Sequence, residues 1–91
     1  MLLEDRVRKR LVERRLIEIV EMVAEQHHVL AREVLGPVRL KTYVAARHEV
    51  WRVIRERHGF SFPELGHLFE RDPTSIRYGV QSAIERMVDG G

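Results

Sequence analysis

A polar segment close to the end of the chain carries the side chains whose types and spacing suggest a chemistry. Between positions 72 and 78 it offers a carboxylate, two aliphatic hydroxyls, a guanidinium and a phenol. Such donors and acceptors form hydrogen bonds to the edges of base pairs in the major groove of DNA. The segment therefore predicts base-edge contacts to double-stranded DNA. Its candidate residues are Asp72, Pro73, Thr74, Ser75, Arg77 and Tyr78.

A basic region precedes this polar segment. Six of the residues from 39 to 58 are Arg or Lys, and only Glu49 and Glu56 are acidic. Such a cluster attracts a polyanion even though the formal net charge of the whole chain is only +2. Cations beside a base-reading segment grip phosphates and hold that segment in register. The phosphate candidates are Arg39, Lys41, Arg47, Arg55 and Arg71.

Other chemistries find little support in the residue types. The chain has no cysteine, which excludes disulfides, cysteine-based zinc sites and thiol catalysis. Its histidines show no HxxxH spacing, and the adjacent His27 and His28 point to different sides of a helix. Ser61 is better explained as a helix cap than as a nucleophile, since no partner motif accompanies it. We therefore expect neither an enzyme nor a bound metal, cofactor or small-molecule substrate.

Length and hydropathy set bounds on the architecture. The 91 residues have room for one small domain, and an apolar fraction of 44% is ordinary for a globular protein. The longest apolar runs are too short for a membrane-spanning helix. The first six residues lack the layout of a signal peptide. We expect a cytoplasmic, nucleoid-associated protein.

The elements that must position the candidate residues all show helical periodicity. A first long helix is predicted from Leu3 to Gln26, and its part before Arg15 is more polar and is expected to project beyond the core. A short helix is predicted from Ala31 to Leu35, before a Gly-Pro pair. The next helix is predicted from Thr42 to Arg57, capped by that threonine and ended by Gly59.

The strongest start signals lie on either side of a three-residue turn. Ser61 and Glu64 fit a capping box, which opens a short helix that ends near Phe69. After the turn, Asp72-Pro73 supplies a preferred cap and a preferred first residue for the last helix. Gly66 in the first helix of the pair indicates a close approach of the second. The predicted buried stripe of the last helix is Ile76, Val80, Ala83, Ile84 and Met87.

Two helices joined by such a turn form a helix-turn-helix, whose second helix enters the major groove. The segment from Ser61 to Ile76 resembles this motif in the C-terminal DNA-binding domain, domain IV, of the bacterial replication initiator DnaA. That family typically reads S-L-P-E-I-G and R-D-H-T-T-V, where this chain has SFPELG and RDPTSI. The resemblance implies an all-α, Trp-repressor-like fold of about five helices. It also implies major-groove contacts by Asp72, Thr74 and Ser75, and phosphate contacts by Arg39, Lys41, Arg47 and Arg55.

The resemblance also implies an organisation of the chain. Residues 1–13 would form a helical extension, 14–88 the DNA-binding domain, and 89–91 a flexible tail. The sequence contains no GxxxxGK[ST] motif, so it corresponds to a stand-alone or fragment version of the domain without the ATPase. Pro73 replaces the family's histidine, and the turn is one residue shorter than in many initiators. These departures predict a DNA target other than the family's usual box.

Several interpretations stay open at this stage. The chain is expected to act as a transcriptional regulator, phage-derived or part of a longer regulator. The alternative is a replication-initiation factor or anti-initiator that docks a protein partner. The charged stretch from Arg6 to Arg15 is a solvated helix face, a homodimer contact through the N-terminal helix, or an additional phosphate contact.

Overall fold

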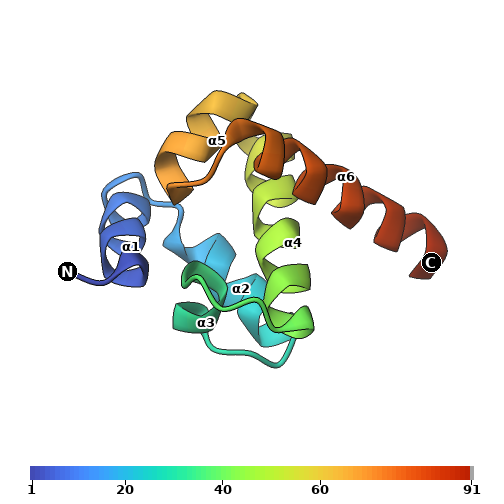
Figure 1. The fold of residues 1–91 in the computed structure, drawn as a ribbon, viewed down its shortest axis with the longest axis horizontal. Helices are drawn as coiled ribbons and strands as arrows, with labels where there is room; N and C mark the ends of the chain where they lie inside the picture. The colour runs from blue at the N-terminus through green and yellow to red at the C-terminus, as the bar shows by residue number, and fades with distance from the viewer. Residues whose placement is uncertain (91) are drawn as a thin grey trace.

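The fold of residues 1–90, which a computed structural model describes, consists of helices joined by short turns (Figure 1). Six helices are found in this range, where the sequence predicted about five, because the first predicted helix is in fact two. The all-α prediction with a helix-turn-helix is confirmed. The helices are α1 (Leu3–Glu13), α2 (Ile17–Gln26), α3 (Ala31–Leu35), α4 (Lys41–His58), α5 (Phe62–Phe69) and α6 (Pro73–Gly90).

The predicted helix from Leu3 to Gln26 is wrong, because the chain turns sharply between α1 and α2. Arg15 has a φ of 60°, and the amide of Leu16 donates to the carbonyl of Leu11 at 2.8 Å. The turn brings Leu16 into the core. The expectation that the preceding segment projects beyond the core is also wrong, since Val7 and Leu11 are fully buried. α1 contacts α3 and α5 instead.

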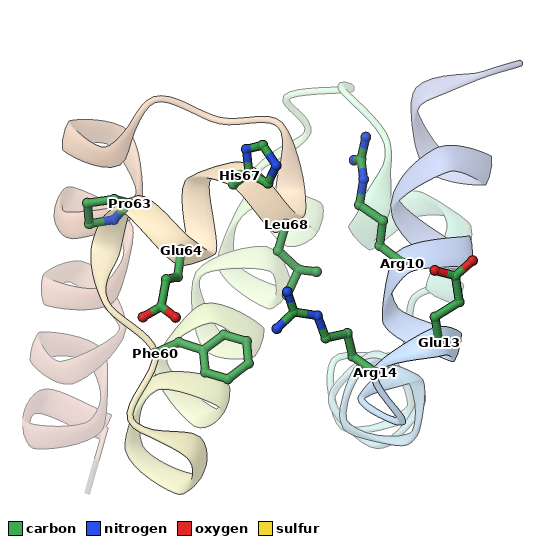
Figure 2. A pocket seen from close by; sticks show the side chains of 8 residues that line it. All are labelled: Arg10, Glu13, Arg14, Phe60, Pro63, Glu64, His67 and Leu68. Carbon is green, nitrogen blue, oxygen red and sulfur yellow. The ribbon is translucent and has the colours of Figure 1, made fainter.

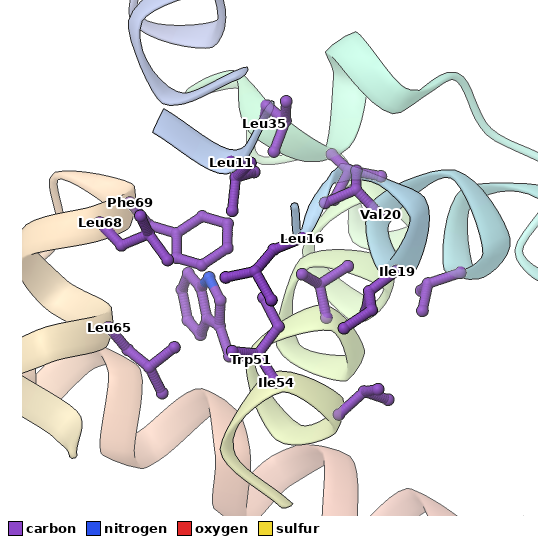
Figure 3. Packing of buried hydrophobic residues seen from close by; sticks show 14 of the residues in the cluster. Leu11, Leu16, Ile19, Val20, Leu35, Trp51, Ile54, Leu65, Leu68 and Phe69 are labelled. Carbon is purple, nitrogen blue, oxygen red and sulfur yellow. The ribbon is translucent and has the colours of Figure 1, made fainter. Parts of the chain in front are cut away.

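The core gathers around α4, which contacts α2, α3 and α6. Trp51 lies at its centre and is almost fully buried, with its ring edge-on to Phe69 at a centroid distance of 6.1 Å. Figure 3 shows Leu16 and Leu65 beside this pair, so residues from α4, α5 and the α1–α2 turn meet there.

The ends of α4 and α5 largely follow the local signals. α4 begins at Lys41, one residue earlier than predicted, and Thr42 is not its cap because Leu40 occupies that position. Gly59 ends α4 with a φ of 68°, a left-handed conformation that glycine adopts without strain. The capping box of α5 is present: the amide of Glu64 donates to Ser61 Oγ at 3.1 Å, and Glu64 Oε1 accepts from the Ser61 amide at 2.9 Å.

The last helix begins where the sequence predicts, but its buried stripe is shorter. Ile76, Val80 and Ala83 are buried, whereas Ile84 is 38% and Met87 53% exposed. Figure 1 shows the reason, because the last turns of α6 run past α4 and have no helix beside them. The helix continues through Gly90, and Gly91 lies outside the described residues, so the flexible tail at 89–91 stays a prediction. Within the described residues, no helix is long and apolar enough to cross a membrane.

Candidate nucleic-acid interface

The three-residue turn between α5 and α6 is held from three directions. Glu70 accepts hydrogen bonds from arginines of α1, at 2.9 and 3.0 Å from Arg6 and at 2.8 Å from Arg10. Arg71 Nη2 donates to the carbonyl of Gly36, in the segment after α3, at 2.9 Å. Asp72 Oδ1 accepts from the amide of Thr74 at 2.8 Å, which is the predicted cap of α6. The turn thus ties the start of α6 to α1 and to the segment after α3.

Gly66 permits the tightness of this turn. A Cβ at this position would lie 2.5 Å from the carbonyl oxygen of Arg71 and 3.4 Å from the nitrogen of Pro73. The amide of Arg71 also donates to the carbonyl of Gly66 at 2.9 Å. The close approach predicted for this glycine is therefore present, and it is the turn with the first residue of α6 that approaches.

The first two turns of α6 present polar side chains to solvent. Thr74, Ser75, Arg77 and Tyr78 are all exposed, while the intervening Ile76 is fully buried. The remaining base-edge candidates, Asp72 and Pro73, are exposed as well. Near its start, the helix is thus anchored by Ile76, and the neighbouring side chains are free to contact a ligand.

A hollow of about 590 Å³ lies between this part of α6 and the N-terminal half of α4. Three of the predicted phosphate candidates, Arg39, Arg47 and Arg71, line it together with Thr74 and Ser75. We call it the arginine hollow. Its lining residues are Arg39, Val44, Arg47, His48, Trp51, Glu70, Arg71, Asp72, Thr74, Ser75 and Tyr78.

A second hollow lies on the other flank of α6. Arg55, the fourth arginine candidate, lines it with Arg77, Thr74 and Tyr78. Because Thr74 and Tyr78 border both hollows, the start of α6 forms the ridge between them. Arg55 is partly occupied there, since its guanidinium lies 3.9 Å from the centroid of the Phe62 ring.

Arg47 is held differently from the free surface side chain that its predicted role requires. It is only 3% exposed. Its Nε donates to the carbonyl of Val34 at 2.7 Å, and its Nη2 donates to Glu33 at 3.0 Å and to Val38 at 3.1 Å. The guanidinium therefore stitches α4 to α3 and to the loop that carries Arg39. A side chain committed to three backbone carbonyls holds this loop in place, and the phosphate contact predicted for Arg47 stays a prediction.

The electrostatics of the arginine hollow favour an anion. Burial and the nearby charges of Arg71 and Arg39 lower the pKa of Arg47 to about 10. Burial and the charge of Arg39 also lower the pKa of Arg71. Positive charges that disfavour one another gain when an anion arrives between them. Lys41 is exposed at the start of α4 but is not part of the lining.

Two residues near the arginine hollow were missed from the sequence. Burial and the charges of Arg86, Arg47 and Arg71 lower the pKa of His48 to about 4. Its Nδ1 lies 3.3 Å from Nη1 of Arg86, and since a guanidinium only donates, Nδ1 accepts. The helical spacing of Val44, His48 and Trp51 was the available signal, because residues three and four apart share a face. Nothing local indicated Arg86.

Similarity to known proteins bears on this arrangement. Residues 16–82 match the family described as bacterial dnaA protein helix-turn-helix. The chain is similar to proteins named "Chromosomal replication initiator protein DnaA", with 31% identity over 75 residues in Ruegeria sp. and 34% over 70 residues in Thermus thermophilus. These alignments cover 80% and 76% of this chain, and 16% of each relative.

A third relative of the same name, from Cereibacter sphaeroides, is 34% identical over 71 residues. That alignment covers 77% of this chain and again 16% of the relative. The chain therefore spans about 16% of the length of the curated relatives it matches. No solved structure matches the chain.

Proposed function

The chain belongs to the bacterial DnaA helix-turn-helix family, a family of DNA-binding domains, and from this premise we propose that it binds double-stranded DNA sequence-specifically as a regulator of transcription. The start of α6 lies in the major groove in this proposal. Its exposed polar residues read base edges there. The whole-protein activity of the relatives is not transferred, because the chain corresponds to only a small part of each.

The ridge at the start of α6 is the observation that carries this proposal. A recognition helix has to enter a groove while its neighbours contact the phosphates on both sides. Here the ridge has an arginine-lined hollow on one flank and Arg55 with Arg77 on the other. Two phosphate backbones that border one major groove fit this pattern.

The phosphate contacts divide into direct and indirect ones. We assign direct contacts to Arg39 and Arg71 in the arginine hollow, to Lys41 at the start of α4, and to Arg55 on the opposite flank. Arg47 acts mainly through the loop that it holds, since its hydrogen bonds go to backbone carbonyls. Its remaining surface borders the same hollow.

Thr74 and Ser75 are the central base-edge residues of the proposal. A threonine contributes a hydroxyl for a base edge and a methyl group for a thymine methyl. Asp72 keeps one carboxylate oxygen in the helix cap, which leaves the other to accept from a cytosine amino group. Pro73 lies between them without a hydrogen-bonding side chain, which favours a target other than the family's usual box. The domain boundaries at 14 and 88 remain our proposal.

A mobility-shift series at increasing salt tests DNA binding. The four direct phosphate contacts predict an affinity loss of about a hundredfold between roughly 50 and 200 mM salt. The target comes from selecting bound sequences out of a random duplex pool. Thr74→Ala should then relax preference at one position by about 1–3 kcal/mol. Absence of binding to any duplex at low salt contradicts the proposal.

Substitutions that neutralise the proposed phosphate contacts separate DNA binding from partner docking. An anti-initiator that uses the fold to bind a protein has no need for cations in the arginine hollow. Unchanged cellular activity after neutralising Arg39, Lys41 and Arg71 would favour that alternative. A matching loss of activity and of duplex affinity supports the regulator.

A further inference from the structure

The contact between α1 and the helix-turn-helix has a consequence beyond the match to the family, which covers residues 16–82. α1 lies before that range, yet two of its arginines hold Glu70 in the turn that starts the recognition helix. We propose that α1 is a brace for the helix-turn-helix, and that Arg6, Arg10 and Glu70 are positioning residues for DNA recognition. This inference rests on the proposed DNA binding.

The ion pairs of Glu70 form a network, which binds more strongly than an isolated surface ion pair. Arg6 makes two nearly parallel hydrogen bonds to Glu70, from Nε at 2.9 Å and from Nη2 at 3.0 Å. Arg10 adds a third to the same carboxylate at 2.8 Å. Isolated exposed pairs contribute little, whereas bidentate arginine contacts and networks are the exceptions. The carboxylate is thereby fixed in position and orientation.

The backbone of Glu70 links this side-chain contact to the turn between α5 and α6. Its φ is 54°, in the left-handed region that residues other than glycine seldom adopt. The residue ends α5, and two positions later Asp72 caps α6. Fixing the Glu70 side chain therefore restrains the peptide units of the turn, and these set the angle between α5 and α6.

α1 also contacts the other end of α5. The guanidinium of Arg14 lies 5.7 Å from the centroid of the Phe60 ring, just before α5 begins. Figure 2 shows Arg10 on α1 and Arg14, the residue that follows α1, facing α5 across a cleft, with Leu68 between the two helices. Val7 and Leu11 bury the inner face of α1. The helix is thus fastened at both ends of α5, as a brace requires.

Charge provides a second reason for the contact. Glu70 lines the arginine hollow, where the proposed function places DNA phosphates. A bare carboxylate there would repel the phosphates, and the two arginines of α1 offset it. Removing the carboxylate and removing the arginines therefore have opposite simple electrostatic effects, and this difference makes the test decisive.

The experiment measures duplex affinity for three sets of variants. Glu70→Gln removes a negative charge beside DNA, so charge alone predicts tighter binding, whereas loss of the brace predicts weaker binding. We expect both Glu70→Gln and the pair Arg6→Gln with Arg10→Gln to weaken binding by about tenfold, within the two- to thirtyfold range of couplings through neighbouring residues. Both should also reduce the ratio of affinities for the selected and an unrelated duplex. The matched control, Arg8→Gln with Lys9→Gln, also removes two positive charges from α1, but from residues that do not contact the turn.

Combining the variants identifies the route. If the arginines act through Glu70, adding Arg6→Gln and Arg10→Gln to Glu70→Gln causes little further loss. A full additional loss would mean that these arginines contact DNA directly and would overturn the brace. Unchanged or tighter binding of Glu70→Gln overturns it as well. Glu70→Gly serves as a second turn variant, because it suits the left-handed backbone and should still bind more weakly.

A measurement without DNA separates this inference from the proposed function. Hydrogen exchange of the Thr74 amide, bonded to Asp72, and of the Arg71 amide, bonded to Gly66, reports the order of the turn. The brace predicts faster exchange at both amides in Glu70→Gln and not in the Arg8/Lys9 control. Wild-type protein that binds no duplex contradicts the proposed function, while unchanged exchange contradicts the brace.

Discussion

The two sides of α4 carry arginines in opposite electrostatic situations. On one side, Arg52 donates to both carboxylate oxygens of Glu49 at 2.7 and 2.9 Å, and to Glu56 at 2.7 Å. These hydrogen bonds raise the pKa of Arg52, and those to Glu49 contribute most. On the side of the arginine hollow, Arg47 and Arg71 donate to backbone carbonyls instead.

The difference shows which arginines are available to an anion. A carboxylate neutralises its arginine, whereas a carbonyl orients the guanidinium and leaves its full charge in place. Burial, and then the charges of neighbouring arginines, lower the pKa of Arg47 and of Arg71. Sequence composition treats the arginines of α4 alike, and only the structure distinguishes Arg52, which carboxylates neutralise, from Arg47, which donates to carbonyls.

Arg47→Ala is the change with the largest expected effect. It leaves three carbonyls of the α3–α4 connection without their donor, so we expect unfolding free energy to fall by about 2–3 kcal/mol. Arg52→Ala on the opposite side breaks ion pairs in which the side chain of Arg52 is 12% exposed and those of Glu49 and Glu56 are 21% and 54% exposed. Because both carboxylates keep contact with water, we expect a cost of about 1 kcal/mol, smaller than that of Arg47→Ala. Urea denaturation measures both. Equal losses would remove the distinction between the two sides.

The second prediction concerns duplex affinity. Arg39→Gln with Arg71→Gln should weaken binding by about 1–2 kcal/mol, since each substitution removes a charge-assisted hydrogen bond to phosphate. The slope of log affinity against log salt should become shallower by about 0.9 for each phosphate that is no longer neutralised. Arg52→Gln is the control, because Glu49 and Glu56 already neutralise that arginine. A loss of affinity in this control would contradict the assignment.

Gly66→Ala should have an intermediate effect that is confined to the turn. Alanine in a helix gains about 0.5–1 kcal/mol over glycine. Overpacking against a backbone oxygen costs about 1–3 kcal/mol, so the net result should be a destabilisation near 1 kcal/mol. Duplex affinity should fall as well, since the atom displaced is the carbonyl oxygen of Arg71. Thermal unfolding with a binding titration measures both, and a stabilised variant with full affinity would show that the turn yields easily.

The smallest expected effect is the titration of His48. The folded-state pKa of about 4 lies below the ordinary value of 6.5, so neutral His48 favours the fold above pH 6.5, and this contribution declines as the pH falls through 4. A phosphate in the arginine hollow should raise that pKa, because it offsets the arginine charges. Proton NMR of the imidazole with and without duplex measures the change.

Several elements were predictable because their signals act over a few residues. The capping box at Ser61 and the cap at Asp72 place the starts of α5 and α6 and the turn between them with an error of at most one residue. The exposed base-edge candidates follow from the same caps, since helical periodicity places Ile76 inward and its neighbours outward. The family resemblance rested on this segment too, and the match to residues 16–82 confirms it.

Features that depend on contacts between distant residues were not predictable in this way. The burial of Arg47 requires the carbonyls of α3 and its loop to converge on one guanidinium, and the pairing of Arg6 with Glu70 joins residues 64 positions apart. Met87 is exposed because the last turns of α6 run past α4, which depends on how the two helices pack. Capping and periodicity are local preferences of the backbone, so the chain alone specifies its reading helix. Which arginines keep their charge free for DNA is settled by tertiary packing, because only packing decides whether a carboxylate or a carbonyl lies within reach.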